Sequence, residues 1–307
     1  MRTLVTGGAG FIGSHIVDAF IQAGHQVAVI DNLHTGKLAN LNPRATFYKM
    51  DLRDAEGLAR VFDLEKPEAI SHQAALADVR GSLLDPAAYA EVNIIGSIHL
   101  LELARRHGVR KVVYASTGGA VYGEPEYVPV TEAHPVNPLD AYGASKHAVE
   151  HYLFLYKHNF DLNWVALRYP NVYGPRQDTM GEAGVVAIFS GRMLASQPCT
   201  INGDGLQQRD FVYVGDIAQA NLLAIEHGSG IYNIGSGIPT DINTVFSLLK
   251  TASGYESEPL SAPAKLGEVR RTYLDATRAR AELGWAPTVD VADGLRRTIQ
   301  SFNRGNG

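Results

Sequence analysis

Tyr142 and Lys146 stand four residues apart in the segment Tyr-Gly-Ala-Ser-Lys. If this segment is helical, both side chains lie on one helical face. A free phenol has a pKa of about 10 and is a poor base at neutral pH. A neighbouring ammonium group, together with the positively charged ring of a bound oxidised cofactor, favours the phenolate and can lower that pKa by a few units. We therefore predict that Tyr142 is a general base and acid that Lys146 activates.

A glycine-rich turn near the start predicts a dinucleotide site. Gly7, Gly10 and Gly13 follow a short apolar run and open a helical pattern, a spacing that lets backbone N–H groups approach a diphosphate. Asp31, 18 residues after Gly13, can accept both hydroxyls of an adenosine ribose and would repel a 2′-phosphate, so we predict NAD rather than NADP. The predicted cofactor contacts are Gly7, Gly10, Phe11, Ile12, Gly13, Asp31, Asn32, Asp51, Leu52, Gln73, Ala74, Ala75, Asn93, Tyr142, Lys146 and Pro170.

These residues need a framework, and the first half of the chain alternates strand and helix patterns. The predicted strands are 2–6, 26–30, 46–50, 68–72, 110–115 and 162–167, and the predicted helices between them are 11–23, 54–64, 86–107 and 141–159. Such alternation indicates an α/β fold, a Rossmann-type doubly wound parallel sheet with ligands at the carboxyl ends of the strands. We predict a NAD-binding domain over 1–170. A smaller substrate-binding lobe over 171–307, with short helices near 185–196, 215–227, 241–253 and 290–303, returns to the core domain in places.

Composition excludes several classes of protein. The chain has 307 residues, and its 27 basic and 32 acidic residues give a net charge of −5, so nothing favours binding to nucleic acid or to an anionic membrane. No apolar run approaches the roughly 18 residues of a membrane span, and the start lacks a signal-peptide pattern. The single cysteine, Cys199, excludes internal disulfides and a multi-cysteine zinc site. We predict a cytoplasmic protein without a metal, and we interpret His72 as a buried core histidine.

Seven segments together resemble the extended short-chain dehydrogenase/reductase family, and the resemblance covers essentially the whole chain. They are Thr6–Gly13 (TGGAGFIG), Asp31–Leu33 (DNL), Asp51–Leu52 (DL), Ser116–Gly123 (STGGAVYG), Tyr142–Lys146 (YGASK), Arg168–Arg176 (RYPNVYGPR) and Gln208–Val214 (QRDFVYV). The combination is specific for nucleotide-sugar enzymes. It implies an NAD-dependent isomerase that interconverts UDP-glucose and UDP-galactose at carbon 4 through a 4-keto intermediate, and acts on the N-acetylated pair in some members. It also implies a homodimer built on a bundle of the helices 86–107 and 141–159.

The resemblance assigns the substrate side as well. Asn171 and Arg209 would contact the sugar diphosphate, and the segment 200–202 would line the uracil; for Arg209 the alternative is a surface ion pair with Asp210. The implied substrate contacts are Thr117, Asn171, Val185, Thr200, Asn202, Arg209, Glu268 and Thr272.

Three positions depart from the family pattern. Gly118 stands where a serine or threonine is usual, so the hydroxyl beside Tyr142 must come from Thr117 or Ser116, and we favour Thr117. Lys265 replaces an arginine and cannot make a forked phosphate contact, whereas Glu268 can still bind ribose hydroxyls. The small Thr272 would leave space for an N-acetyl group unless neighbouring residues fill it.

Other functions remain open at this point. A 4,6-dehydratase usually carries Asp-Glu after the strand-end threonine, where this chain has Gly118-Gly119. A uronic-acid epimerase or decarboxylase would need a basic cluster for the sugar carboxylate, and we find none dedicated to it. A non-catalytic NAD sensor would typically lack the tyrosine or the lysine, and both are present.

Overall fold

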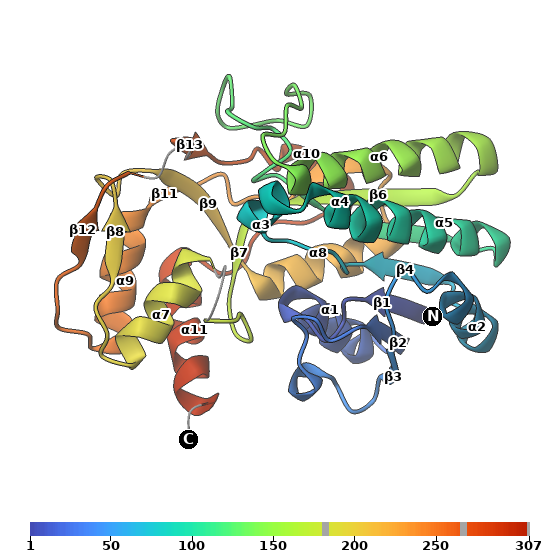
Figure 1. Ribbon diagram of the computed structural model, residues 1–307, viewed down its shortest axis with the longest axis horizontal. Helices are drawn as coiled ribbons and strands as arrows, with labels where there is room; N and C mark the ends of the chain where they lie inside the picture. Colours follow the sequence, from blue (N-terminus) through green and yellow to red (C-terminus); the bar gives the residue numbers. More distant parts are fainter. Residues whose placement is uncertain (180–183, 265–268, 306–307) are drawn as a thin grey trace.

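The structure is a computed structural model that describes residues 1–179, 184–264 and 269–305 of the chain. Its centre is a sheet of seven strands, all parallel, in the order β10-β6-β5-β4-β1-β2-β3 (Figure 1). The strands are β1 (Arg2–Thr6), β2 (Gln26–Asp31), β3 (Thr46–Lys49), β4 (Ala69–His72), β5 (Lys111–Thr117), β6 (Asn163–Tyr169) and β10 (Gly230–Asn233). The order reverses at β1, between β2 and β4, and ligands bind at such a switch point in doubly wound sheets.

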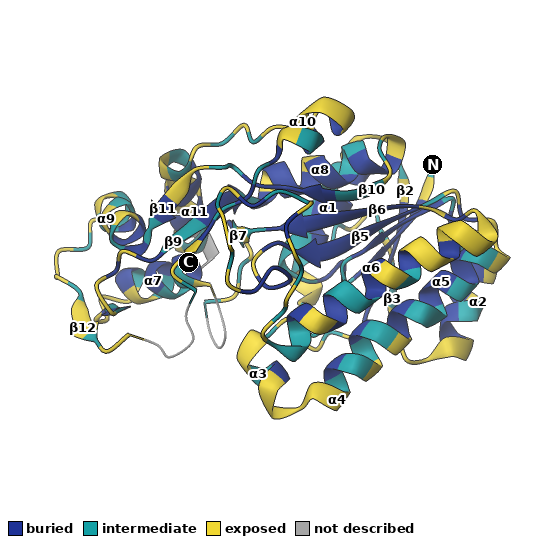
Figure 2. Ribbon diagram, turned by 90° about the horizontal axis from the view of Figure 1, so that it is seen from above, coloured by how far each residue is buried: buried dark blue, intermediate teal, exposed yellow. Residues whose placement is uncertain are grey.

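Helices cover both faces of this sheet, as a buried parallel sheet requires (Figure 2). One face is packed by α1 (Phe11–Gln22) and α8 (Val214–Glu226), with α10 (Thr277–Leu283) beside β10. The other face is packed by α2 (Ala55–Glu65), α5 (Gly96–Arg106) and α6 (Ala141–Phe160). Each face has its own apolar core, and the side chains of the five inner strands are mostly buried, whereas those of the edge strand β3 are not.

The predicted helix 86–107 is divided into segments. It consists of α4 (Pro86–Tyr89), a π-helical stretch η2 (Ala90–Ile95) and α5, and the short helix α3 (Val79–Leu84) precedes it. A π-helical turn widens a helix locally and often occurs beside a functional site. A single 3₁₀ turn, η1 (Leu38–Asn40), follows β2.

The second lobe is built from short strands and three helices around a separate core (Figure 1). Its strands are β7 (Asn171–Tyr173), β8 (Thr200–Asn202), β9 (Gln208–Tyr213), β11 (Pro239–Asp241), β12 (Leu260–Ala262) and β13 (Arg271–Thr272). Its helices are α7 (Val185–Leu194), α9 (Ile242–Ser253) and α11 (Val291–Gly305). The strand β9 pairs with β7, β11 and β13, whereas β8 pairs with β12 in a separate two-stranded sheet.

Apart from the divided helix 86–107, the structure has each predicted strand and helix of the first half within a few residues at the ends. The predicted α/β fold with a doubly wound parallel sheet is confirmed. The strand β10 was not predicted, and together with α8 it places residues from beyond 170 in the larger lobe. The central sheet therefore does not end at residue 170, and the division into a NAD-binding domain and a substrate-binding lobe at this residue stays a prediction. Within the described ranges, no helix has both the length and the apolar character to cross a bilayer.

Candidate active site

The turn between β1 and α1 brings backbone N–H groups to the surface of a cleft. Gly7 has a φ of +69°, and a Cβ there would lie 2.7 Å from the backbone nitrogen of Ala74. A Cβ on Gly13 would lie 2.1 Å from the carbonyl oxygen of Gly7, so only glycine permits this packing of helix against turn. Gly10 begins α1 without a side-chain cap, and the first helical turn carries no acid. The helix N-terminus therefore remains available to an anionic group such as a diphosphate.

The carboxylate of Asp31 is fixed at the end of β2. It accepts hydrogen bonds from the backbone N–H groups of Ala9, at 3.0 Å, and Leu33, at 2.8 Å. The next strand places Asp51 nearby, where its carboxylate accepts hydrogen bonds from Asn32 and Arg53. The hydrogen bond from Arg53 holds the pKa of Asp51 well below its usual range. Two acidic side chains thus stand near the adenosine end of the predicted site, an arrangement that suits ribose hydroxyls and disfavours a 2′-phosphate.

One cleft joins these groups with the predicted catalytic pair. Fifteen of the predicted residues line it: Gly7, Gly10, Phe11, Ile12, Gly13, Asp31, Asn32, Asp51, Leu52, Gln73, Ala74, Ala75, Ser116, Tyr142 and Lys146. The sequence analysis missed further lining residues, including Thr35, Val92, Ala115 and Tyr169. Ala115 and Tyr169 lie near the carboxyl ends of β5 and β6, so the strand pattern itself carried the signal that would have found them.

The first turn of α6 positions Tyr142, because Asp140 caps this helix by accepting a hydrogen bond from the Gly143 N–H at 2.7 Å. The Tyr142 hydroxyl is hydrogen-bonded to Thr117. One turn later, Lys146 is 3% exposed and donates from Nζ to the Ala115 carbonyl oxygen at 2.8 Å. Its Nζ lies 5.9 Å from the centroid of the Tyr142 ring.

The electrostatics of the pair differ from the sequence-based prediction. Burial raises the pKa of Tyr142 to about 12, although the Thr117 hydrogen bond opposes this. Burial also lowers the pKa of Lys146 to about 7, since no described carboxylate pairs with it. In the polypeptide alone the tyrosine pKa is therefore raised, and the lowering, which also depends on the charge of the nicotinamide ring, stays a prediction for the protein with NAD bound. A lysine that is itself half neutral near pH 7 cannot offset the desolvation of the phenolate.

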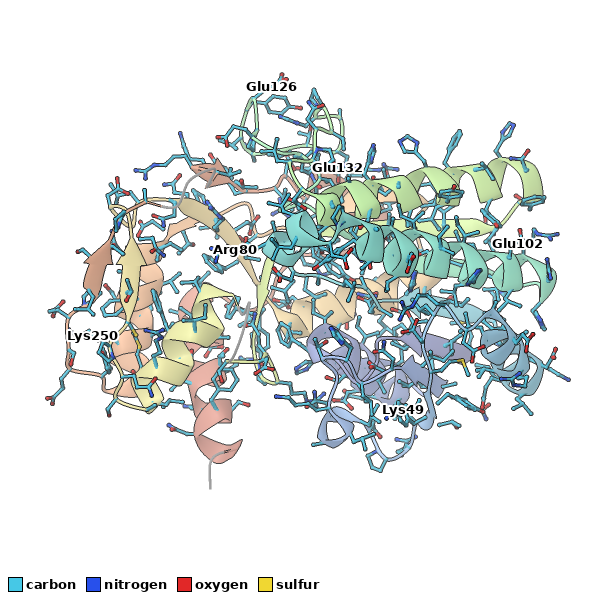
Figure 3. All side chains as sticks on the ribbon, viewed as in Figure 1. Lys49, Arg80, Glu102, Glu126, Glu132 and Lys250 are labelled. Carbon is cyan, nitrogen blue, oxygen red and sulfur yellow. The ribbon has the colours of Figure 1, made fainter. Side chains whose placement is uncertain are left out.

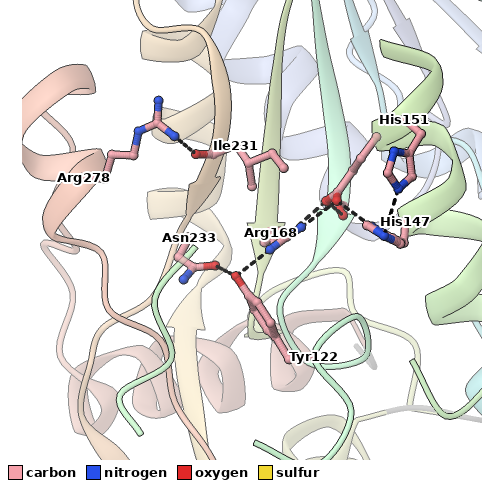
Figure 4. A network of polar contacts seen from close by, with 9 residues as sticks. Tyr122, His147, His151, Arg168, Ile231, Asn233 and Arg278 are labelled. Carbon is pink, nitrogen blue, oxygen red and sulfur yellow. Dashed lines mark hydrogen bonds and ion pairs between the residues drawn. The ribbon is translucent and has the colours of Figure 1, made fainter. Parts of the chain in front are cut away.

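Ser116 lines the cleft, but its hydroxyl belongs to a separate network of hydrogen bonds. Figure 4 shows Arg168, Tyr122 and Asn233 of this network. The Ser116 hydroxyl donates to Oε1 of Glu150 at 2.7 Å, and Glu150 also accepts two hydrogen bonds from the guanidinium of Arg168, at 2.9 and 2.6 Å. The third contact of Arg168 is the Tyr122 hydroxyl at 2.8 Å, which in turn donates to Asn233. The hydroxyl beside Tyr142 is thus that of Thr117, whereas Ser116 is held by Glu150.

The profile of the NAD dependent epimerase/dehydratase family matches residues 3–235. The chain belongs to this family. A UDP-glucose 4-epimerase of Mycolicibacterium smegmatis is 45% identical, over 98% of both chains. A crystal structure of the UDP-glucose 4-epimerase of Thermotoga maritima with UDP-glucose is 48% identical, covers 100% of both chains and has a TM-score of 0.98. The UDP-glucose 4-epimerase of Thermus thermophilus, crystallised with NAD, is 47% identical over 99% of both chains, with a TM-score of 0.93.

NAD is the cofactor of this family, and the residues of the cleft fit it. The uncapped helix N-terminus after Gly10 suits a diphosphate, and Asp31 suits a ribose. A Cβ on Gly7 or Gly13 would make contacts that are too close, so this turn requires glycine at both positions. The predicted cofactor is therefore supported by the local geometry as well as by the family.

Two polar residues considered in the sequence analysis, the predicted cofactor contact Asn93 and the predicted core residue His72, are engaged inside the protein. Asn93, in η2, is 1% exposed; it accepts from the Leu76 N–H and donates to the Leu76 carbonyl and to Ser145, so it fastens the loop after β4 to α6. It does not line the cleft, and this places it in a positioning role.

His72 is hydrogen-bonded to Thr6 and Ser97, and burial lowers its pKa to about 3. The interpretation of His72 as a core residue is confirmed.

The second lobe brings some of the predicted substrate-binding residues close together. Register places Thr272 of β13 beside Arg209 of β9, and Asn171 of β7 beside Phe211, two residues further along β9. Thr200 and Asn202 belong to the separate strand β8, and Val185 begins α7. Asp210 is buried and accepts hydrogen bonds from Ser236, Gly237 and Leu274. Pro170 lies between β6 and β7, and Lys265 and Glu268 lie outside the described residues.

Proposed function

We propose that the protein interconverts UDP-glucose and UDP-galactose by inverting carbon 4 of the sugar. The observation that carries this proposal is a half-buried tyrosine, Tyr142, bonded to Thr117 and one helical turn from Lys146, in the wall of a cleft that fits NAD. The similar proteins support the same reaction, because all three are UDP-glucose 4-epimerases and the similarity extends over nearly the whole length of each chain.

Each residue has a defined part in this reaction. When bound, NAD supplies a hydride acceptor and donor for carbon 4, and its oxidised ring adds positive charge beside Tyr142. Tyr142 takes the proton of the sugar 4-hydroxyl and later returns it, and Thr117 fixes its hydroxyl. Lys146 is anchored by the Ala115 carbonyl and binds ribose hydroxyls. Because the reaction has no net oxidation, the cofactor stays with the protein between cycles.

On the substrate side, we assign the diphosphate to Asn171 and Arg209 and the uracil to Thr200 and Asn202. Val185 and Glu268 complete the proposed contacts with the nucleotide. Thr272 is 7% exposed and sits beside Arg209 in the sheet. A side chain of this size leaves room for an N-acetyl group, so we include the N-acetylated pair among the proposed substrates.

Gly118 argues against the alternative of a 4,6-dehydratase. A Cβ at this position would lie 2.5 Å from a methyl group of Leu274, which is fully buried. The carboxylate that a dehydratase usually carries there cannot be accommodated without moving Leu274. The same contact gives a packing reason for the departure from the family's usual serine or threonine.

We also propose a homodimer in the cytoplasm. Large apolar side chains are exposed on the helices predicted to form the bundle, namely Ile95 (47% exposed) in η2 and Phe154 (64%) and Leu155 (43%) in α6. The two helices lie side by side (Figure 2). A second copy would cover these side chains, as expected for an isologous interface. Phe154→Glu should shift the sedimentation coefficient towards that of a monomer, and an unchanged value would refute this interface.

The activity is tested by supplying UDP-galactose and detecting UDP-glucose, and then UDP-N-acetylgalactosamine and its gluco product. We expect the first conversion without added NAD and a loss of about 1,000-fold or more in Tyr142→Phe, since the phenylalanine cannot exchange a proton. NAD released on denaturing the variant shows that the site is still assembled. Near-normal turnover by Tyr142→Phe would refute the assigned role. NAD release with no turnover of either sugar by the parent protein would favour a sensor.

A further inference from the structure

The segment 174–178, which we name the strap, leaves β7 of the second lobe and runs back to the larger lobe (Figure 1). Three contacts connect it to that lobe. They are His15 Nε2 to the Pro175 carbonyl oxygen at 2.9 Å, Arg176 Nη2 to Asp18 Oδ2 at 2.7 Å, and Lys37 Nζ to Asp178 Oδ2 at 3.6 Å. The strap is therefore held by two ion pairs and one hydrogen bond to elements remote in sequence.

The anchors of the strap lie beside the cofactor turn. His15 and Asp18 belong to α1, the helix that begins at the glycine turn, and Lys37 follows the loop after Asp31. Three strap residues, Arg176, Gln177 and Asp178, line a groove that adjoins the cofactor cleft. The groove and the cleft share the lining residues Phe11, His34, Thr35, Ala75, Leu76 and Ala77. The strap is thus one wall of a space continuous with the cleft, at its glycine-turn end.

The backbone at Arg176 is unfavourable for its residue type. Its φ is +67°, in the left-handed region, which a non-glycine residue rarely adopts. Glycine, asparagine or aspartate would suit that backbone better. Arginine gives this strained position a guanidinium that reaches Asp18, and Asp18 is itself oriented by a hydrogen bond from Asn42 at 2.8 Å.

We propose that the strap is a latch that slows the departure of NAD from the cleft, with Arg176–Asp18 and Lys37–Asp178 as its closures. The established family property is that NAD is used. The new element is that these four residues, none of which was assigned to the site, set how long the cofactor stays. Opening the latch would separate the strap from α1 and widen the groove beside the glycine turn.

A change of charge at Asp18 distinguishes a latch from simple electrostatic attraction between the protein and the anionic cofactor. Asp18→Asn removes a negative charge near the diphosphate-binding turn, so plain electrostatics predicts slower release of the anionic cofactor. The latch predicts faster release by roughly threefold, the size expected when a partly exposed ion pair is weakened. The variant retains an amide oxygen for Asn42, which limits other disturbance.

A charge swap provides the rescue. Arg176→Asp suits the left-handed backbone and should release NAD about fivefold faster, because it faces Asp18 with a like charge. Combining it with Asp18→Arg restores an ion pair of reversed polarity at the same net charge, and should return the rate to within about twofold of the parent. A control variant is Lys250→Ala on α9, which lies on the outer side of the second lobe (Figure 3). It breaks the ion pair between Lys250 and Glu258.

The measurement uses the NAD-loaded protein and needs no sugar turnover. Released NAD is reduced at once by excess alcohol dehydrogenase with ethanol, and the absorbance of the NADH formed gives the release rate. Faster release in Asp18→Asn, Arg176→Asp and the exposed Lys37→Ala, with rescue by the swap and no change in Lys250→Ala, supports the latch. Release at or below the parent rate in Asp18→Asn overturns it, as does a swap that releases NAD as fast as Arg176→Asp alone. Because the rate is read without substrate, this result is independent of whether the proposed epimerase activity is found.

Discussion

Two buried cations near the cleft have opposite environments. Lys146 is 3% exposed, donates to the Ala115 carbonyl and lies over the rings of Tyr114 and Tyr142, and no carboxylate of the described residues pairs with it. Burial therefore lowers its pKa to about 7. Arg168 is 2% exposed and forms a two-bond ion pair with Glu150. Burial opposes the charge of Arg168, but Glu150 outweighs it and raises the arginine pKa. A buried charge with a counter-ion is fixed, whereas one without a counter-ion can change its protonation near neutral pH.

The difference is instructive because one helix serves both cations. Lys146 and Glu150 are one turn apart on α6, yet the carboxylate of Glu150 faces Arg168 on β6. Burial raises the pKa of Glu150, but the hydrogen bonds from Arg168, His147 and Ser116 outweigh this and bring it to about 2. Glu150 therefore stays ionised and committed to Arg168, and Lys146 is left to respond to what enters the cleft.

The largest effect should come from breaking the fixed pair. Glu150→Ala leaves Arg168 buried without its counter-ion and should lower the free energy of unfolding by about 3–5 kcal/mol. Urea unfolding followed by circular dichroism measures this loss. The apolar double variant Glu150→Leu with Arg168→Met is the matched control and should be more stable than Glu150→Ala. If the double variant were less stable than Glu150→Ala, the main cost of Glu150→Ala would not be the uncompensated charge of Arg168.

Removing the unpaired cation should affect turnover more than stability. Lys146→Met deletes a buried charge that has no counter-ion, so the folded state loses little, but the tyrosine loses its cationic neighbour. We expect turnover to fall by about 100-fold at neutral pH. Initial rates with UDP-galactose and urea unfolding of the same samples give both values. A loss of stability as large as that of Glu150→Ala would erase the distinction between the two cations.

The same lysine predicts a pH dependence of stability. In the unfolded chain its amine keeps the proton up to its usual pKa of about 10.4, whereas in the folded protein it releases it near 7. Between these values the unfolded state binds more protons, so the contribution of Lys146 makes the free energy of unfolding rise with pH. Urea unfolding at pH 7, 8 and 9 should show a smaller rise for Lys146→Met than for the parent. Parallel curves would mean that the lysine pKa is not lowered.

The sequence predicted one of the two regions and not the other. The glycine turn, Asp31 and the Tyr142–Lys146 spacing are local patterns, and their geometry follows from the strand and helix that carry them. The pairing of Glu150 with Arg168 joins residues on different elements, and no spacing rule reveals it. The four residues of β10 are too few for a periodic pattern, and they join the sheet by pairing with β6. The sign of the Tyr142 pKa shift also could not be read, since it depends on burial and on the protonation of Lys146 itself.

The smallest expected effects separate the two hydroxyls at the end of β5. Thr117→Val removes the hydrogen bond to Tyr142 at nearly constant volume and should lower turnover by about tenfold, the value of one such bond. Ser116→Ala removes the bond to Glu150 and should cost about 1–2 kcal/mol of unfolding free energy, because the acceptor is charged, while turnover changes less than twofold. Rates and urea midpoints of both variants make the test. If Ser116→Ala had the larger effect on turnover, the fixed network around Arg168 would extend into the catalytic step, and the separation of the two regions would be wrong.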